Sequence, residues 1–300
     1  MSAASTPGSL RIVLFTDMPQ IAAYYSQFLA AKGHRIVGVV TSRKRNFGFV
    51  DVVSSAPASA DVLVSDRPRR WAAMLAPLRP ELIISTVFPW RIPQDVIDLP
   101  ALGAINVHPS LLPRYRGTMT PNWTFLNGEH TSGLTVHRMV ADFDAGPVLA
   151  QMSLEITDED ELSSYMQRLF AHAPSLIEAA LTRVIAGDPG DAQDESQATY
   201  YGMLPDDQRV IDWSSPARRV HNQIRGFAAL VDPPGAYGTL DGTPSRILRT
   251  QLLSNDGTIA DALPGTILSG SDDGLIVQCG DGPIRILAFE GLETPPQPLP

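Results

Sequence analysis

The chain has 300 residues, of which 44% are hydrophobic, and this allows one large buried core or two smaller ones. Its formal net charge is −9 and its only lysines are Lys32 and Lys44, which argues against broad nonspecific binding of nucleic acid, because such binding depends on basic side chains. The sequence shows neither a signal-peptide pattern nor an uninterrupted apolar run of about 18 residues, so we expect a cytoplasmic protein without a membrane partner.

The first forty residues show the pattern of a strand, a helix and a second strand. The apolar run Leu10–Phe15 predicts a buried strand, residues 21–32 carry apolar side chains at helical spacing, and Gly33 ends this helix. The run Arg35–Val40 predicts a second buried strand, as is typical of a parallel sheet. The turn between the first strand and the helix lacks the Gly-x-Gly-x-x-Gly pattern, which argues against a nicotinamide or flavin cofactor bound at such a turn.

The next segment leads to a loop in a position typical of ligand binding. Residues 41–60 lack a clear pattern and predict irregular or short secondary structure. We expect an inner strand at Val62–Val64, a helix at Pro68–Leu78 and a fully buried strand at Leu82–Val87. The loop Phe88–Pro93 leaves the carboxyl end of this strand, where ligands enter open α/β sheets. Its two aromatic residues are interpreted either as a lid over a ligand or as packing.

The central stretch carries polar side chains at the ends of apolar runs. Asn106 and His108 lie two residues apart at the end of a strand predicted over 104–107, so their side chains project from one face. A second strand, predicted over 134–139, leads to Asp144 in a loop that can fold back toward them. An amide donor, an imidazole and a carboxylate that meet at a strand end are suited to acyl transfer.

The second half of the chain changes from helical to β character. The pattern over 158–187 predicts a long helix that Pro174 kinks or divides, and residues 187–196 read as a polar linker. A further helix is expected at 211–227. Short strands separated by Gly, Asp and Pro are predicted at 237–240, 245–252, 265–268, 274–279 and 283–289. This spacing predicts a small β-barrel or β-sandwich.

Other titratable side chains are interpreted as structural or surface groups. Metal-site spacing is absent from the remaining histidines, which are His34, His130, His137, His172 and His221. The single cysteine, Cys279, lies in an alternating run and predicts a buried structural thiol. The basic clusters at 43–45 and 67–70 are interpreted as solvated charge, with capture of an anionic ligand as the alternative.

The central stretch resembles the folate-dependent formyltransferase family, which includes methionyl-tRNA formyltransferases and the sugar and siderophore N-formyltransferases. Residues 106–117 carry the signature Asn-x-His-Pro-Ser-Leu-Leu-Pro-x-Tyr-Arg-Gly, and residues 144–147 carry Asp-x-Gly-Pro. Residues 200–227 and 264–266 are similar to the C-terminal domain of that family. The resemblance therefore extends beyond the central stretch.

The resemblance implies a fold and a set of site residues. The fold is α/β, with a Rossmann-like formyltransferase catalytic domain at 1–190 and a smaller, mainly β, OB-like domain at 205–300. The implied formyl donor is 10-formyltetrahydrofolate, with no metal, and the implied catalytic residues are Asn106, His108 and Asp144. The pterin of such enzymes lies beside two loops, whose residues here are Phe88, Trp90, Ile92, Val140 and Asp142. Asp142 is interpreted either as a second functional carboxylate or as a residue that hydrogen-bonds within its loop.

The implied catalytic side chains suit formyl transfer to nitrogen. When an amine attacks the formyl carbon, negative charge develops on the carbonyl oxygen, to which Asn106 can donate a hydrogen bond. A protonated His108 could help to stabilise this oxygen. His108 is also suited to accept the proton of the amine, directly or through water, because histidine ordinarily titrates near neutral pH, and Asp144 would orient its ring and bias its protonation.

The acceptor is predicted from regions outside the central stretch. Residues 205–300 contain 12 acidic residues, 7 arginines and no lysine, and residues 41–60 carry one short basic cluster. We therefore expect a small amine, such as an amino sugar or a hydroxyornithine-type siderophore precursor, in preference to methionyl-tRNA. Hydrolysis of 10-formyltetrahydrofolate and noncatalytic folate binding are further alternatives. The sequence does not indicate an oligomeric state.

Overall fold

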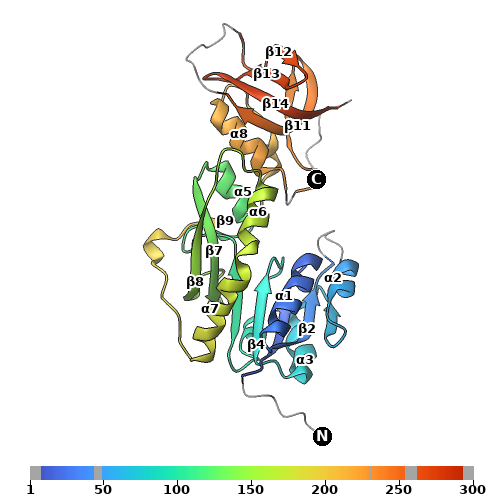
Figure 1. The fold of residues 1–300 in the computed structure, drawn as a ribbon, viewed down its shortest axis with the longest axis vertical. Coiled ribbons are helices and arrows are strands. Elements are labelled where there is room, and N and C mark those ends of the chain that lie inside the picture. The colour runs from blue at the N-terminus through green and yellow to red at the C-terminus, as the bar shows by residue number, and fades with distance from the viewer. Residues whose placement is uncertain (1–7, 44–48, 230, 254–261, 293–300) are drawn as a thin grey trace. The chain divides into compact units, whose positions relative to one another are not determined.

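A computed structural model describes residues 8–43, 49–229, 231–253 and 262–292 of the chain. The chain divides into two compact units built from interleaved segments (Figure 1). Unit 1 comprises Met1–Arg116, Gly133–Met152 and Ala171–Thr199, and unit 2 comprises Gly117–Ser132, Ser153–Phe170 and Tyr200–Pro300. Of the basic cluster at 43–45, Arg43 is described, and Lys44 and Arg45 lie outside the described residues.

Within the described residues, a seven-stranded sheet has the order β3-β2-β1-β4-β5-β7-β8. Its strands are β1 (Arg11–Phe15), β2 (Arg35–Thr41), β3 (Asp61–Val64), β4 (Leu82–Thr86), β5 (Ala104–His108), β7 (Thr131–Arg138) and β8 (Val148–Glu155). The strands from β3 to β5 pair in parallel, and β7 pairs antiparallel with β5. The apolar runs of β1 and β4 are buried on both faces, as expected for parallel strands covered by helices.

The helices of unit 1 cover both faces of this sheet. They are α1 (Pro19–Ala31), α2 (Phe49–Ser55), α3 (Trp71–Leu75), α4 (Gln94–Ile97) and α7 (Ala173–Ile185), with the 3-10 turns η1 (Pro68–Arg70), η2 (Ala76–Leu78) and η3 (Glu195–Gln197). Helix α1 ends just before Gly33, whose φ of 80° suits glycine. Lys32 and Glu178 form an ion pair that joins the end of α1 to α7.

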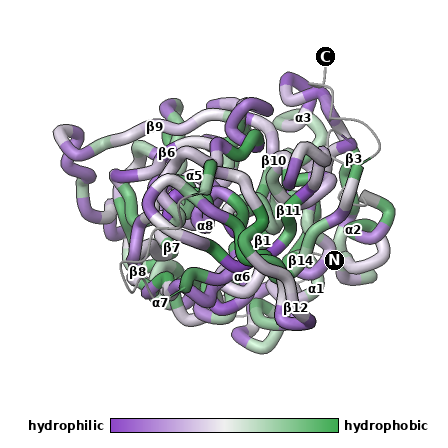
Figure 2. Tube along the Cα trace, turned by 90° about the horizontal axis from the view of Figure 1, so that it is seen from above, coloured by the Kyte–Doolittle hydropathy of each residue, from purple (hydrophilic) through white to green (hydrophobic). Residues whose placement is uncertain are grey.

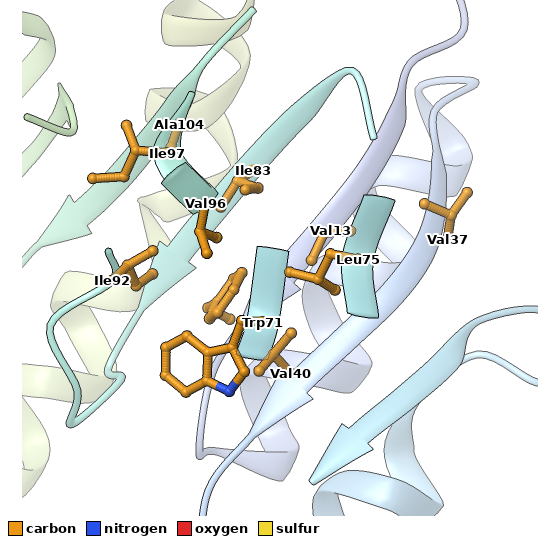
Figure 3. Close-up of a cluster of buried hydrophobic side chains, with 11 residues drawn as sticks. Val13, Val37, Val40, Trp71, Leu75, Ile83, Ile92, Val96, Ile97 and Ala104 are labelled. Carbon is orange, nitrogen blue, oxygen red and sulfur yellow. The ribbon is translucent and has the colours of Figure 1, made fainter. Parts of the chain in front are cut away.

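The core on one face of the sheet supports the loop after β4. Trp71 and Leu75 of α3 and Val96 and Ile97 of α4 pack on side chains of β1, β2 and β4 (Figure 3). The ring of Phe15 lies 5.6 Å from that of Trp71 and 5.2 Å from that of Phe88. Each large apolar side chain buried in this way contributes roughly 1.5–3 kcal/mol. Packing of Phe88 on this core therefore fixes the start of the loop 88–93.

Unit 2 contains an antiparallel sheet with the order β10-β11-β14-β13-β12. Its strands are β10 (Ala236–Leu240), β11 (Thr243–Leu252), β12 (Ile267–Ser271), β13 (Gly274–Gln278) and β14 (Pro283–Gly291). Its remaining elements are α5 (Thr120–Leu126), α6 (Leu162–Ala171), α8 (Ala217–Gly226), η4 (Asp206–Arg209) and the short pair β6 (Arg116–Gly117) and β9 (Tyr200–Tyr201). Figure 2 shows hydrophobic residues along β1, in the sheet of unit 1. The predicted fold class, α/β followed by a smaller, mainly β region, is confirmed.

The structure divides one predicted helix in two, divides another into short segments, and buries the single cysteine. The long helical pattern divides at His172, just before Pro174, into α6 and α7. The helix expected at 68–78 is present as three consecutive short helical segments, η1, α3 and η2. Cys279 is buried, and this burial raises the pKa of its thiol to about 12, which confirms a structural thiol.

Two predictions about element placement are wrong. Strand β3 lies at the edge of the sheet and not inside it, and its residues are exposed or half-buried. The helix expected from Ile211 begins only at Ala217. Ile211 lies outside any helix, with its amide donating to the Tyr237 carbonyl at 2.6 Å, and Trp213 lies in a turn. Both side chains join the core of unit 2.

Candidate active site

Strand β5 places Asn106 and His108 on one face of the sheet at its carboxyl end. The pairing of β5 with β7 sets Asn106 opposite His137 and His108 opposite Thr135. Side chains of directly paired residues lie on the same face. This register brings a second histidine to the predicted catalytic pair.

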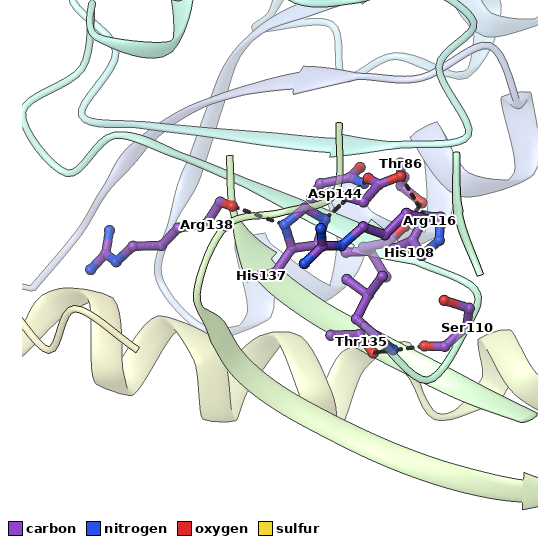
Figure 4. A network of polar contacts seen from close by, with 12 residues as sticks. Thr86, His108, Ser110, Arg116, Thr135, His137, Arg138 and Asp144 are labelled. Atoms are coloured by element: carbon purple, nitrogen blue, oxygen red, sulfur yellow. Dashed lines mark hydrogen bonds and ion pairs between the residues drawn. The ribbon is translucent and has the colours of Figure 1, made fainter. Parts of the chain in front are cut away.

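Asp144 reaches these side chains from the loop between β7 and β8. Its backbone φ of 54° lies in the left-handed region, which aspartate adopts more readily than most residues. A Cβ atom at Gly146 would stand 1.9 Å from the carbonyl oxygen of Arg138, so glycine is required for the loop to return. The Oδ2 atom of Asp144 lies 3.6 Å from Nδ1 of His108, and Oδ1 lies 3.4 Å from Nδ2 of Asn106 (Figure 4). The structure therefore brings together Asn106, His108 and Asp144.

The two ring nitrogens of His108 have different surroundings. Nε2 lies 2.7 Å from the carbonyl oxygen of Tyr115, which can only accept, so Nε2 carries a hydrogen. In the neutral ring, Nδ1 then presents its lone pair toward Asp144. Burial lowers the pKa of His108, against the opposing effects of the Asp144 charge and the Tyr115 carbonyl, and nearby His137 lowers it further. His108 is thus neutral at pH 7, with Nδ1 ready to take a proton.

His137 belongs to the same cluster, although we interpreted it from the sequence as a structural or surface residue. Its Nε2 atom lies 3.4 Å from Oδ1 of Asp144 and 3.3 Å from Nδ2 of Asn106. Its Nδ1 atom lies 2.8 Å from the carbonyl oxygen of Arg138. The sequence could have indicated this position for His137. An antiparallel pairing of its predicted strand with β5 places His137 beside Asn106.

A network of hydrogen bonds from other segments of unit 1 holds the loop that carries Asp144. Nε2 of Gln193 donates to the carbonyl oxygens of Asp144 and Gly146, both at 2.7 Å. Its Oε1 atom accepts from the fully buried guanidinium of Arg116, which also binds both carboxylate oxygens of Glu195 at 2.7 and 2.9 Å. Sequence reasoning missed Gln193 and Glu195 because 187–196 read as a polar linker, and it placed Arg116 in the signature without this role. The polar composition of 187–196 conceals its contacts with the rest of unit 1.

The two loops predicted to bind the pterin are joined at the carboxyl edge of the sheet. Arg91 donates to the carbonyl oxygen of Ala141, and its guanidinium lies 5.5 Å from the ring centre of Phe143. Val87, immediately before the first loop, has a φ of 46°, which is strained for a β-branched residue. Such strain is often found at functional sites.

The residues predicted to bind the pterin differ in exposure. Phe88 and Trp90 are half-buried against the core, and Val140 and Asp142 are exposed. The side chain of Ile92 is only 4% exposed and belongs to the core, which leaves its backbone for any ligand contact.

The described residues lack both a metal-binding cluster and a membrane-spanning helix. Among these residues, His, Cys, Asp and Glu side chains do not form a group of three that could hold a metal ion. The same part of the chain contains no helix of the length and apolar character needed to cross a bilayer.

Sequence comparisons match both parts of the chain to formyl transferases. Residues 10–181 match the family model described as formyl transferase, and residues 203–293 match the formyl transferase C-terminal domain. A methionyl-tRNA formyltransferase of Pseudomonas fluorescens is 36% identical over 296 residues, which cover 95% of this chain and 89% of the relative. One of Pelobacter propionicus is 34% identical over 289 residues, which cover 93% of this chain and 88% of the relative.

Solved structures share the fold at lower sequence identity. HypX from Aquifex aeolicus, solved in complex with tetrahydrofolic acid, is 18% identical with a TM-score of 0.68. The match covers 94% of this chain but 44% of HypX, so this chain spans less than half of that protein. WlaRD, a sugar 3N-formyl transferase solved in the presence of dTDP and 5-N-formyl-THF, is 17% identical with a TM-score of 0.67, covering 95% of this chain and 98% of WlaRD.

Proposed function

The chain belongs to the formyl transferase family, and from this membership we propose that it transfers the formyl group of 10-formyltetrahydrofolate to the amino group of methionyl-tRNA. The observation that carries the chemistry is the meeting of Asn106, His108 and Asp144 at the carboxyl end of β5, with distances of 3.4 and 3.6 Å to the carboxylate. An amide donor, a neutral imidazole and a carboxylate supply what acyl transfer to nitrogen requires.

The proposed mechanism gives each side chain one task. Asn106 donates a hydrogen bond to the formyl oxygen as the amine attacks the formyl carbon and the oxygen becomes negative. His108 accepts the amine proton at Nδ1, while its Nε2–H stays bound to the Tyr115 carbonyl. Asp144 balances the positive charge of the imidazolium. His108 then returns the proton to the departing folate nitrogen, which restores the neutral ring.

The loops at the edge of the sheet have the chemistry to hold a pterin ring. Phe88 and Trp90 offer flat aromatic surface that the core already supports. Val140 and Asp142 would face the ligand from the second loop, and the Arg91 contact with Ala141 holds the two loops together. The bound folate supplies the activated formyl group.

The choice of acceptor reverses the preference drawn from the sequence. Relatives between 32% and 36% identical along nearly the whole chain carry the name methionyl-tRNA formyltransferase, and this supports tRNA as the acceptor. A small amine is the second candidate. It is favoured by the acidic balance of residues 205–300, which contain 12 acidic residues and 7 arginines.

The test is to incubate the protein with 10-formyltetrahydrofolate and each acceptor in turn, and to follow the mass of the acceptor. Methionyl-tRNA, an amino sugar nucleotide and hydroxyornithine are the acceptors, and Asn106→Ala is the control. A formyl gain on methionyl-tRNA supports the proposal, and a gain on a small amine alone supports the second candidate. Formate release without an acceptor would indicate a hydrolase, and no turnover would indicate a folate-binding protein.

A further inference from the structure

We propose that His137 is a positioning residue that holds the side-chain amide of Asn106 in the orientation that donates to the formyl oxygen. The inference rests on the proposed formyl transfer, because that reaction gives the Asn106 amide its task. His137 lies directly opposite Asn106 in the pairing of β5 and β7. Its Nε2 atom lies 3.3 Å from Nδ2 of Asn106.

The hydrogen on the His137 ring is placed by a backbone carbonyl. Nδ1 lies 2.8 Å from the carbonyl oxygen of Arg138, and a carbonyl oxygen can only accept, so Nδ1 carries the hydrogen. In the neutral ring, Nε2 then has a lone pair, and both Nδ2 of Asn106 at 3.3 Å and Oδ1 of Asp144 at 3.4 Å lie near it. Of these two groups, the amide is the one that has hydrogens to donate. An amide N–H satisfies this lone pair, whereas an amide oxygen would be repelled by it. The ring therefore selects the orientation that turns Nδ2 of Asn106 toward it.

This orientation leaves one amide hydrogen for the substrate. The NH2 group of Asn106 has two hydrogens, and Nε2 of His137 engages one of them. The other has Oδ1 of Asp144 as its neighbour at 3.4 Å. During formyl transfer this second hydrogen turns to the formyl oxygen as that oxygen becomes negative, while Nε2 of His137 keeps the first. His137 thus fixes the orientation of the Asn106 amide, while the hydrogen on the side of Asp144 is available to the formyl oxygen.

Burial makes the anchor rigid. His137 is buried near the end of β7, and its ring is roughly perpendicular to that of His108, with centres 6.3 Å apart. The ring cannot leave this place without losing its Arg138 contact. If the anchor is removed, the Asp144 carboxylate alone opposes a turn of the amide, and a turned amide presents its oxygen to the formyl oxygen, which repels it.

The test compares two substitutions that separate the ring nitrogens. In His137→Gln the amide oxygen takes the place of Nε2 as acceptor, whereas His137→Asn has no group that reaches Asn106. We expect His137→Asn to lower kcat roughly tenfold, less than the roughly 100-fold or more that loss of an oxyanion donor costs, with little change in KM for folate. His137→Gln should recover most of this loss. Equal losses in the two variants would overturn the proposal.

A double-mutant cycle with Asn106→Ala separates positioning from packing. If His137 acts through Asn106, His137→Asn costs nothing further once Asn106 is alanine, whereas the same loss in both backgrounds would contradict the proposal. His130→Asn is the matched control, because His130 is exposed just before β7 and should leave kcat unchanged.

A spectroscopic measurement tests the contact between His137 and Asn106 without relying on formyl-transfer activity. Long-range proton–nitrogen NMR of the histidine rings should find the hydrogen of His137 on Nδ1, and His137→Asn should shift the side-chain amide signals of Asn106. A hydrogen on Nε2, or unshifted amide signals, would overturn the contact. If the unsubstituted protein formylates none of the acceptors, the proposed function fails, and this failure is visible before any variant is made.

Discussion

The carboxyl edge of β5 in unit 1 and the interior of unit 2 each bury a histidine, but they treat it differently. His221 in α8 has both ring nitrogens bound, Nδ1 to the Thr250 hydroxyl at 2.9 Å and Nε2 to the Asp158 carbonyl oxygen at 3.0 Å. His108 has Nε2 bound at 2.7 Å and Nδ1 facing a carboxylate at 3.6 Å. Burial lowers the pKa of both rings, to about 4 for His221.

The comparison shows that burial and a lowered pKa do not by themselves make a reactive histidine. Both nitrogens of His221 are committed to structural contacts, so this ring can stabilise the fold but has no free lone pair for a substrate. His108 is anchored at one nitrogen and keeps the other for a proton.

The largest effect is expected from alanine substitution at the two histidines. His108→Ala should lower kcat roughly 1000-fold, equivalent to about 4 kcal/mol, because a general base is lost, while the melting temperature changes little. His221→Ala should do the reverse, lowering the melting temperature with kcat largely retained. Formyl-transfer assays and thermal unfolding of both variants check this. Similar kcat losses in the two variants would remove the distinction between them.

The second effect is the pH dependence of stability that His221 introduces. The pKa of His221 is about 4 in the folded chain, below the ordinary 6.5. As the pH falls below 6.5, the unfolded chain therefore binds a proton at His221 while the folded chain does not. The free energy of unfolding is therefore undiminished above pH 6.5 and falls by about 3 kcal/mol as the pH is lowered from 6.5 to about 4. This size follows from the difference between the two pKa values, because one pKa unit corresponds to about 1.36 kcal/mol. Urea unfolding at several pH values should show this loss, reduced in His221→Gln. An identical pH slope in the variant would refute the assignment.

Charge removal beside His108 should have the third effect. Asp144→Asn keeps the shape of the side chain but removes the charge that balances the His108 imidazolium, so we expect turnover to fall roughly 30-fold, about 2 kcal/mol, with folate binding largely intact. Steady-state kinetics and folate titration measure the two quantities. Near-normal turnover would exclude Asp144 from the mechanism.

The smallest effect is expected from the network outside the site. Gln193→Ala removes two hydrogen bonds of 2.7 Å to the loop of Asp144, so the carboxylate is held less firmly. We expect kcat to fall roughly fivefold, about 1 kcal/mol, with the fold retained. Gln197→Ala is the matched control, because Gln197 contacts the exposed carboxylate of Asp194. Equal kcat values for the two variants would show that the loop is held without Gln193.

Much of this arrangement could be predicted because its causes are local. The alternation of side chains along β5 placed Asn106 and His108 on one face, and the apolar runs of β1, β2 and β4 indicated a buried parallel sheet. Pro174 indicated the division between α6 and α7, because proline lacks the amide hydrogen that a helix interior needs.

The remainder depends on contacts between segments far apart in the chain. His137 enters the site through the register of β5 with β7, which the pattern of one strand does not contain. Gln193 and Arg116 are 77 residues apart, and their hydrogen bonds exist only once the segment 191–199 packs on the rest of unit 1. The edge position of β3 likewise depends on the order in which strands pair.

The central claim is that His108 takes the proton of the attacking amine, and the pH dependence of formyl transfer tests it most directly. Because burial lowers the pKa of His108, kcat/KM for the acceptor should fall only below pH 6.5, as the ring becomes protonated. In His108→Ala, the residual rate should lose this acidic limb. An acidic limb that persists unchanged in His108→Ala would contradict the account.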